Sequence, residues 1–189
     1  MILSDATIDR FSRQILLPEV GGRGQARLLA ARVRVAGAGR AAEVAADLLG
    51  RSGVGTLGAN VRPADVALAA GGRLPRDPGT PVVWARLAGA AGAVATLVGH
   101  PCPACAAADV AAPRAASGAP GNATPGRALD GLLADAAAQA LGALAAAEVL
   151  GVLLGTVTAA RVQRLDLAAG RWDGTRLAGP GCVQCGRGA

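Results

Sequence analysis

A short apolar run that leads into two glycines constrains this chain more than any other feature. Residues 32–36 are typical of a buried strand, and Gly37, Ala38 and Gly39 follow it directly. Behind them, residues 41–50 place their apolar side chains at helical spacing. A strand, a glycine turn and a helix form the phosphate-binding start of doubly wound nucleotide-binding folds, because glycines let the backbone approach a pyrophosphate at the helix N-terminus.

The glycine pattern by itself is a weak signal. Ala42 stands where the nucleotide-binding fingerprint has its third glycine, a replacement that the fingerprint tolerates. The chain is also rich in alanine and glycine throughout. A working nucleotide site and a purely structural turn are therefore both open at this point.

The composition suits a single domain with a core of small aliphatic side chains. The 189 residues suffice to bury a core, and 52% are hydrophobic, but only 2% are aromatic, so alanine, valine and leucine must fill that core. The net charge is +6, and every basic residue is arginine. Because the arginines are scattered and few aromatic rings could stack on bases, we do not expect a nucleic-acid partner.

One long apolar run, residues 136–160, fits either a core helix or a membrane-spanning helix. Glu148 lies near its centre, and a carboxylate inside a membrane is costly, so we expect a core helix and no membrane partner. Asp5 and Asp9 stand where a secretory signal needs apolar residues, and we therefore expect a cytoplasmic protein.

Periodicity and turn residues predict the other elements. Expected helices are one that opens at Ser4 or Asp5, one at 25–31 after a turn at 21–24, one at 41–50 and one at 129–154 that Gly142 could interrupt. Expected strands lie near 32–36, 56–61, 81–87, 93–98, 160–167 and 171–177, with at most a short strand or helical turn near 66–70. Residues 112–127 have the composition of a flexible linker.

The four cysteines, Cys102, Cys105, Cys182 and Cys185, form two Cys-x-x-Cys pairs. Each pair can bind one tetrahedral ion, and two pairs complete a closed structural zinc site without an open position for catalysis. Disulfides are the first alternative, which the lack of a signal peptide disfavours. A redox pair is the second, but it does not explain two copies. His100, the single histidine, is either a neighbour of the zinc site or a solvated loop residue.

Several segments match a known family in order and spacing. They are Phe11-Ser12-Arg13-Gln14-Ile15-Leu16-Leu17-Pro18-Glu19, Gly24-Gln25, Val33-x-Val35-Ala36-Gly37-Ala38-Gly39, Ser52-Gly53-Val54-Gly55, the helix with Ala147-Glu148, the closing hairpin and the two cysteine pairs. In these segments the chain resembles the ThiF/MoeB/HesA family, the bacterial relatives of ubiquitin-activating enzymes. The middle of the chain is not matched.

The resemblance implies a Rossmann-like adenylation domain, usually a homodimer. Such enzymes use ATP and Mg²⁺ to adenylate the C-terminal glycine of a ubiquitin-like sulfur-carrier protein or a peptide. Gly37 and Gly39 match the nucleotide loop, and Arg40 replaces a glycine but could meet a phosphate as a cation. Arg13 matches the arginine that reaches the ATP phosphates of the partner subunit, where it would stabilise charge. The four cysteines match the zinc ligands.

Several ATP-binding residues of the family have no counterpart in this chain. Asn60 and Val61 stand where an aspartate should hold the ribose, and the chain has no lysine for the phosphates. The aspartate expected to hold Mg²⁺ falls in a segment that is missing between Val61 and Val82, where the chain is too short for the family's helices and strands.

We therefore expect one α/β domain over residues 1–189, with a reduced central part and a four-cysteine zinc staple. Its parts are N-terminal helices at 1–31, a reduced nucleotide-binding half at 32–99, and a C-terminal helix, hairpin and zinc knuckle at 128–189. The expected function is a ThiF/MoeB-like adenylyltransferase with impaired or lost catalysis, as a homodimer or a heterodimer with a paralogue. The alternative is a non-catalytic, zinc-stapled binding protein for a carrier protein, a peptide or an active paralogue.

Overall fold

The computed structural model describes residues 3–72, 74, 79–99 and 127–177. Helices and strands alternate in the first half of the described chain, and one long helix precedes a hairpin in the second. In order they are α1 (Asp5–Ile15), α2 (Gly21–Ala30), β1 (Arg32–Gly37), α3 (Arg40–Arg51), β2 (Thr56–Gly58), β3 (Val66–Ala70), β4 (Val82–Ala88), β5 (Ala91–Leu97), α5 (Arg127–Leu154), β6 (Arg161–Asp166) and β7 (Arg171–Arg176).

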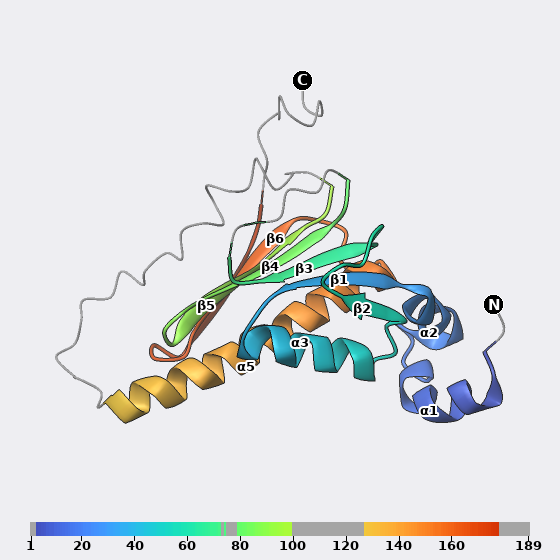
Figure 1. Ribbon diagram of the computed structural model, residues 1–189, viewed down its shortest axis with the longest axis horizontal. Helices are drawn as coiled ribbons and strands as arrows, with labels where there is room; N and C mark the ends of the chain where they lie inside the picture. The colour runs from blue at the N-terminus through green and yellow to red at the C-terminus, as the bar shows by residue number, and fades with distance from the viewer. Residues whose placement is uncertain (1–2, 73, 75–78, 100–126, 178–189) are drawn as a thin grey trace, which may run out of the picture.

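Seven strands form one mixed sheet in the order β2-β1-β3-β4-β5-β6-β7. β2, β1, β3 and β4 run parallel to one another, whereas β5, β6 and β7 each run antiparallel to the strand before them. α3 and α5 lie side by side on one face of this sheet (Figure 1). The structure thus confirms the predicted α/β fold, with a parallel half that begins at β1 and an antiparallel half that ends in a hairpin.

The larger core lies between the sheet and these two helices. It joins valines and leucines of four strands to the inner faces of α3 and α5, among them Val33, Leu68, Val83, Val94, Leu49 and Leu141. Alternate residues of β3, β4 and β5 point to the opposite face, together with Val162 of β6. There they form a second buried cluster, which includes Ala67, Val82, Trp84, Ala95 and Val162.

α5 is a continuous helix of 28 residues, not one that is interrupted at Gly142. A Cβ atom at Gly142 would lie 2.6 Å from the carbonyl oxygen of Ala41 and 2.9 Å from Cβ of Val44, so the glycine marks the place where α3 and α5 touch. Residues Leu129–Leu154 are long and apolar enough to cross a membrane, with a mean hydropathy of 1.8. The same helix packs on the sheet through Leu141 and Val149, which are fully buried.

The prediction of a turn at residues 21–24 is wrong, because α2 begins at Gly21. Two further glycines make this a poor helix start by propensity, and its N-cap residue, Val20, gives no side-chain hydrogen bond. Packing outweighs propensity here. A Cβ at Gly24 would lie 3.0 Å from Leu154, so the glycine lets α2 approach the end of α5.

Candidate functional site

The turn between β1 and α3 has the backbone conformation that the sequence predicts. Gly37 ends β1 with φ of 109°, and Gly39 precedes α3 with φ of 89°. A Cβ at Gly37 would lie 2.0 Å from the carbonyl oxygen of Ala70, so glycine is required where β1 touches the end of β3. At Gly39 a Cβ would meet no atom within 4 Å. The second glycine therefore borders open space at the start of α3.

The first turn of α3 can receive an anion. Gly39 is its N-cap and provides no side-chain hydrogen bond, although its carbonyl oxygen accepts one from the amide of Glu43 at 3.1 Å. The first amides of a helix have no partner inside that helix, and they lie at the positive end of its dipole. This geometry fits a phosphate group at Gly39.

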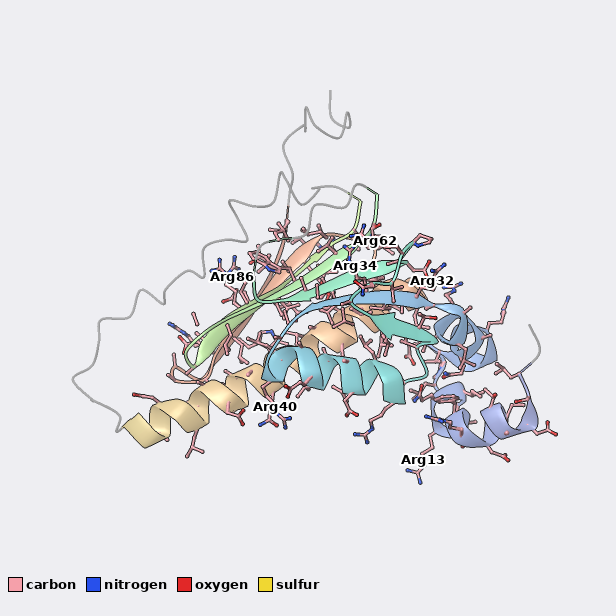
Figure 2. All side chains as sticks on the ribbon, viewed as in Figure 1. Arg13, Arg32, Arg34, Arg40, Arg62 and Arg86 are labelled. Carbon is pink, nitrogen blue, oxygen red and sulfur yellow. The ribbon has the colours of Figure 1, made fainter. Side chains whose placement is uncertain are left out.

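Arg40, the cation of this turn, is directed away from the sheet (Figure 2). Its guanidinium lies 3.9 Å from the carboxylate of Glu43, and both side chains are more than half exposed. Such an exposed pair is weak, so Arg40 can exchange Glu43 for another anion.

Among the residues that the structure describes, the sheet edge beside the turn has no carboxylate placed to hold a ribose or a magnesium ion. The pairing of β2 with β1 ends at Gly58, which lies opposite Arg34. β2 therefore stops at a level three residues before Gly37 of β1. Asn60 lies in a turn after β2, outside the paired strand. β3 reaches the level of Gly37 but continues into Gly71 and Gly72. No carboxylate stands within two residues of the end of β1, β2, β3 or β4, so the described residues do not fit Mg²⁺.

Arg13 lies far from this turn in the same chain. It belongs to α1, which lies at the other end of α3, where Thr7 and Arg10 face Gly53. α3 has 12 residues and is therefore about 18 Å long. Figure 2 shows Arg13 pointing away from the body of the molecule, whereas Arg40 lies at the opposite end of α3. Arg13 therefore lies about the length of α3 away from the glycine turn of its own chain.

All four predicted zinc ligands, and His100, lie outside the described residues. Within the described part of the chain no group of three or more His, Cys, Asp or Glu side chains could hold a metal ion. The strands that precede the two cysteine pairs nevertheless end together. Thr96 of β5 and Arg176 of β7 both pair with Arg161 of β6, so β5 and β7 end at the same edge of the sheet, about 10 Å apart.

A buried polar cluster beneath β5 and β6 was not predicted. Glu148 of α5 is 2% exposed and accepts hydrogen bonds from Thr96 Oγ1 at 2.6 Å and from Arg161 Nε at 3.0 Å and Nη2 at 2.7 Å. The amide of Gln163 is its fourth donor. The hydrogen bond from Arg161 to Glu148 raises the pKa of Arg161 against the opposing effect of its partial burial. Arg161 and Gln163 lie two residues apart in β6 and therefore share one face of the strand. These two polar residues were the sequence signal that could have indicated the cluster.

The architecture and the turn define a Rossmann-like α/β protein whose parallel half carries a glycine turn. The fold is that of E. coli MccB: the structure of MccB with succinimide has a TM-score of 0.62, covering 94% of this chain and 74% of that one at 12% identity. The structure of MccB with AMPCPP and MccA gives 0.61 at the same identity. No family model matches the chain.

Several curated relatives match part of the sequence. Adenylyltransferase and sulfurtransferase MOCS3 of Mus musculus is 54% identical over 56 residues, which are 30% of this chain and 12% of that protein. SAMP-activating enzyme E1 of Haloferax volcanii is 52% identical over 54 residues, 28% of this chain and 20% of that protein. These partial matches confirm the resemblance to the ThiF/MoeB/HesA family in the stretch that they cover, which is less than a third of this chain.

Proposed function

We propose that this chain is a reduced ThiF/MoeB-like adenylyltransferase that binds the phosphates of ATP at the glycine turn but adenylates weakly or not at all. The observation that carries the proposal is the backbone at Gly37 and Gly39. Gly39 combines a positive φ with open space at an uncapped helix start, which is the arrangement a phosphate needs.

The same edge of the sheet explains why catalysis would be weak. ATP-dependent adenylation needs Mg²⁺ and cations that offset the charge developing on the phosphates. β3 ends in two glycines instead of a carboxylate, β2 stops before it reaches the turn, and the chain has no lysine. Arg40 is the nearby cation, and it lies against Glu43.

The partner that we propose is the C-terminus of a ubiquitin-like sulfur-carrier protein or of a peptide. The names of the relatives support this class, since one activates SAMP and another structure holds MccB together with MccA. We also propose a dimer, either of two copies or with a paralogue. Its support is the position of Arg13, which cannot reach the turn of its own chain.

A non-catalytic binding protein is the second candidate, and the lack of carboxylates at the strand ends favours it. In that case the glycine turn would only let β1 pass close to β3, as the contact between Gly37 and Ala70 requires. The chain would then bind a carrier protein, a peptide or an active paralogue, with a zinc staple at its C-terminal part.

ATP binding and ATP–pyrophosphate exchange separate these functions. Calorimetry with up to about 5 mM ATP, well above common Michaelis constants, tests the turn, and exchange in the presence of a carrier tail ending in Gly-Gly tests catalysis. We expect binding with little or no exchange. Gly39→Val should weaken binding at least about tenfold, because valine is strained at this φ and fills the phosphate space.

Gly170→Ala is the matched control, because Gly170 also has a positive φ and open space around it but lies between β6 and β7. It should leave ATP binding unchanged. Fast exchange would contradict the loss of catalysis. No ATP binding by the unmodified chain, or equal binding by Gly39→Val, would overturn the nucleotide site and leave the binding protein.

A further inference from the structure

The edge of the sheet at β7 is open. β7 is the last strand in the order, and among the residues that the structure describes no strand pairs with its outer side. All six residues of β7 are exposed. The strand has no proline and no lysine, and its pairing with β6 continues through all six residues without a bulge. It therefore lacks the usual protections of an edge strand and can accept a further strand.

The hydrogen-bond pattern determines which backbone groups of β7 face outward. The amide of Leu177 donates to the carbonyl oxygen of Ala160, the residue directly opposite, at 2.9 Å. Hydrogen-bonded and non-hydrogen-bonded pairs alternate along an antiparallel ladder, so every second residue back from Leu177 turns its amide and carbonyl toward β6. The residues between them turn these groups toward the free edge. They are Trp172, Gly174 and Arg176.

The side chains of these three residues share the face of the sheet that carries α5. Trp172 pairs with Leu165, which packs on the core under the helices, yet the tryptophan side chain is 65% exposed. Gly174 leaves space beside it, since a Cβ there would meet only Cγ of Gln163, at 3.9 Å. Arg176 adds a cation two residues further along. The free edge thus presents an aromatic ring, a gap and a guanidinium in a row.

We propose that β7 pairs with β7 of a second copy of this chain, antiparallel and about a two-fold axis at Gly174. In this register Trp172 lies opposite Arg176 of the second copy, so a ring and a guanidinium meet on each side of the axis. Asp173 lies opposite Thr175 of the second copy, and this pair can form a hydrogen bond. Each contact occurs twice, because a two-fold interface is self-complementary.

The residues of β7 favour this register over its neighbours. Outward-facing residues must pair with outward-facing residues, and the axis at Gly174 pairs all seven residues from 171 to 177. An axis at Asp173 would place two carboxylates directly opposite each other, which destabilises a sheet. An axis at Thr175 would leave Trp172 beyond the end of the paired strand. α5 packs on β3, β4, β5 and β6, so β7 itself separates this helix from the second copy.

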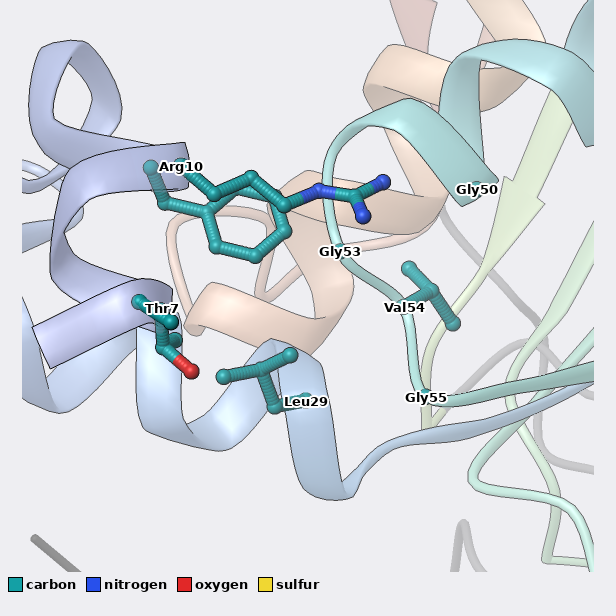
Figure 3. Close-up of a pocket in the computed structure, with 9 residues that line it drawn as sticks. Thr7, Arg10, Leu29, Gly50, Gly53, Val54 and Gly55 are labelled. Carbon is teal, nitrogen blue, oxygen red and sulfur yellow. The ribbon is translucent and has the colours of Figure 1, made fainter. Parts of the chain in front are cut away.

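This contact is separate from the dimer proposed through Arg13. α1 lies beside the turn that carries Gly53, and Arg10 extends toward that turn (Figure 3). β2 follows the turn directly, and β2 and β7 are the two edges of the sheet, six strand spacings or roughly 29 Å apart. The inference therefore depends neither on the nucleotide site nor on Arg13, and pairing at β7 leaves α1 accessible.

Analytical ultracentrifugation of the full chain between about 1 and about 500 µM tests the association. Two paired strands of seven residues form less than a standard interface of about 1,600 Å², so we expect a reversible dimer with a micromolar dissociation constant. Hydrogen exchange measured by NMR locates the contact. The amides of Trp172, Gly174 and Arg176 should exchange at least about tenfold more slowly in the dimer, because their N–H groups gain partners.

Gly174→Pro should abolish the dimer and keep the hairpin, because the amide that it removes faces outward, where an edge strand tolerates proline. Trp172→Ala keeps every backbone group and should weaken the dimer at least about tenfold. Arg176→Gln should weaken it at least about fivefold. Arg171→Gln is the matched control: it removes the same charge from the same strand, but it lies opposite Leu177 of the second copy and should leave the dissociation constant unchanged.

Circular dichroism establishes that the variants are folded. A chain that stays monomeric at about 500 µM would overturn the proposal. So would a dimer in which the three outward amides still exchange fast, or equal association of Trp172→Ala and Arg171→Gln. If the chain is monomeric and a peptide ending in Gly-Gly protects these amides instead, the edge accepts a foreign strand and the pairing of two copies is wrong.

Discussion

Glu148 shows how a carboxylate can be buried in the longest apolar helix of this chain. Its two oxygens accept hydrogen bonds from the side chains of Thr96, Arg161 and Gln163, so its charge is paired and its lone pairs are used. A buried charge without such partners would cost several kcal/mol. The cluster ties the middle of α5 to β5 and β6, and therefore fixes the helix on the antiparallel half of the sheet.

Glu148→Gln should lower the free energy of unfolding by about 2–3 kcal/mol. The new amide group would face the donors of Arg161 and Gln163, and the charge-assisted bonds would be lost. Urea denaturation measures the change. The pKa of Arg161 is raised, so the stabilisation that its charged guanidinium gives to the fold is fully present below the ordinary pKa of arginine. This stabilisation is lost only at higher pH. The difference should therefore not fall as the pH is raised to about 9.

Asp173→Asn is the control for this prediction. Asp173 pairs with Arg164 at 3.4 Å, but its side chain is 65% exposed, so the substitution should cost less than about 1 kcal/mol. Equal losses in the two variants would mean that Glu148 contributes no more than a surface ion pair.

At the scale of secondary structure, α5 depends on a glycine that sequence propensities disfavour. Gly142 lies inside the helix, and its missing side chain lets the backbone of α3 come within van der Waals distance. The contact matters for the candidate site because Ala41 belongs to the first turn of α3. α5 therefore supports the same end of α3 that carries the glycine turn.

Two glycine-to-alanine substitutions in α5 should change stability in opposite directions. Gly142→Ala should destabilise the fold by about 1–3 kcal/mol, because the methyl group would overlap Ala41 and Val44. Gly131→Ala meets no atom within 4 Å and should stabilise it by up to about 1 kcal/mol through helix propensity. Thermal unfolding measures both. A gain in stability for Gly142→Ala would contradict the close packing of α3 and α5.

The elements show what local patterns can predict. The sequence pattern predicted β1, α3 and the closing hairpin. Every residue of β7 is nevertheless exposed, so this strand of the hairpin buries neither face. The pattern missed the start of α2 at Gly21 and the continuity of α5 at Gly142, because α2 packs on the end of α5 at Gly24 and α5 packs on α3 at Gly142. The site divides in the same way. The turn at Gly37 and Gly39 follows from sequence, whereas the early end of β2 and the open edge at β7 depend on tertiary structure.

On the scale of the whole molecule, the sheet brings together two parts of the chain that are far apart in sequence. Leu97 ends β5, and Leu177 follows β7, with its amide bonded to the carbonyl oxygen of Ala160 at 2.9 Å. A Cys-x-x-Cys pair begins five residues after each of these leucines. Five extended residues span about 17 Å, and the two strand ends are about 10 Å apart. Both pairs can therefore reach one ion.

Zinc should consequently bind at about one equivalent per chain, because two cysteine pairs complete a closed tetrahedral site. Elemental analysis of the purified full chain measures this stoichiometry. Cys182→Ser should remove the metal and lower the melting temperature, since a structural zinc ion contributes folding free energy. A chelator should shift the melting curve of the unmodified chain but not that of the variant. A folded chain without metal would contradict this prediction. A melting curve that neither Cys182→Ser nor the chelator changes would also contradict it, because the β6–β7 hairpin would then be stable without zinc.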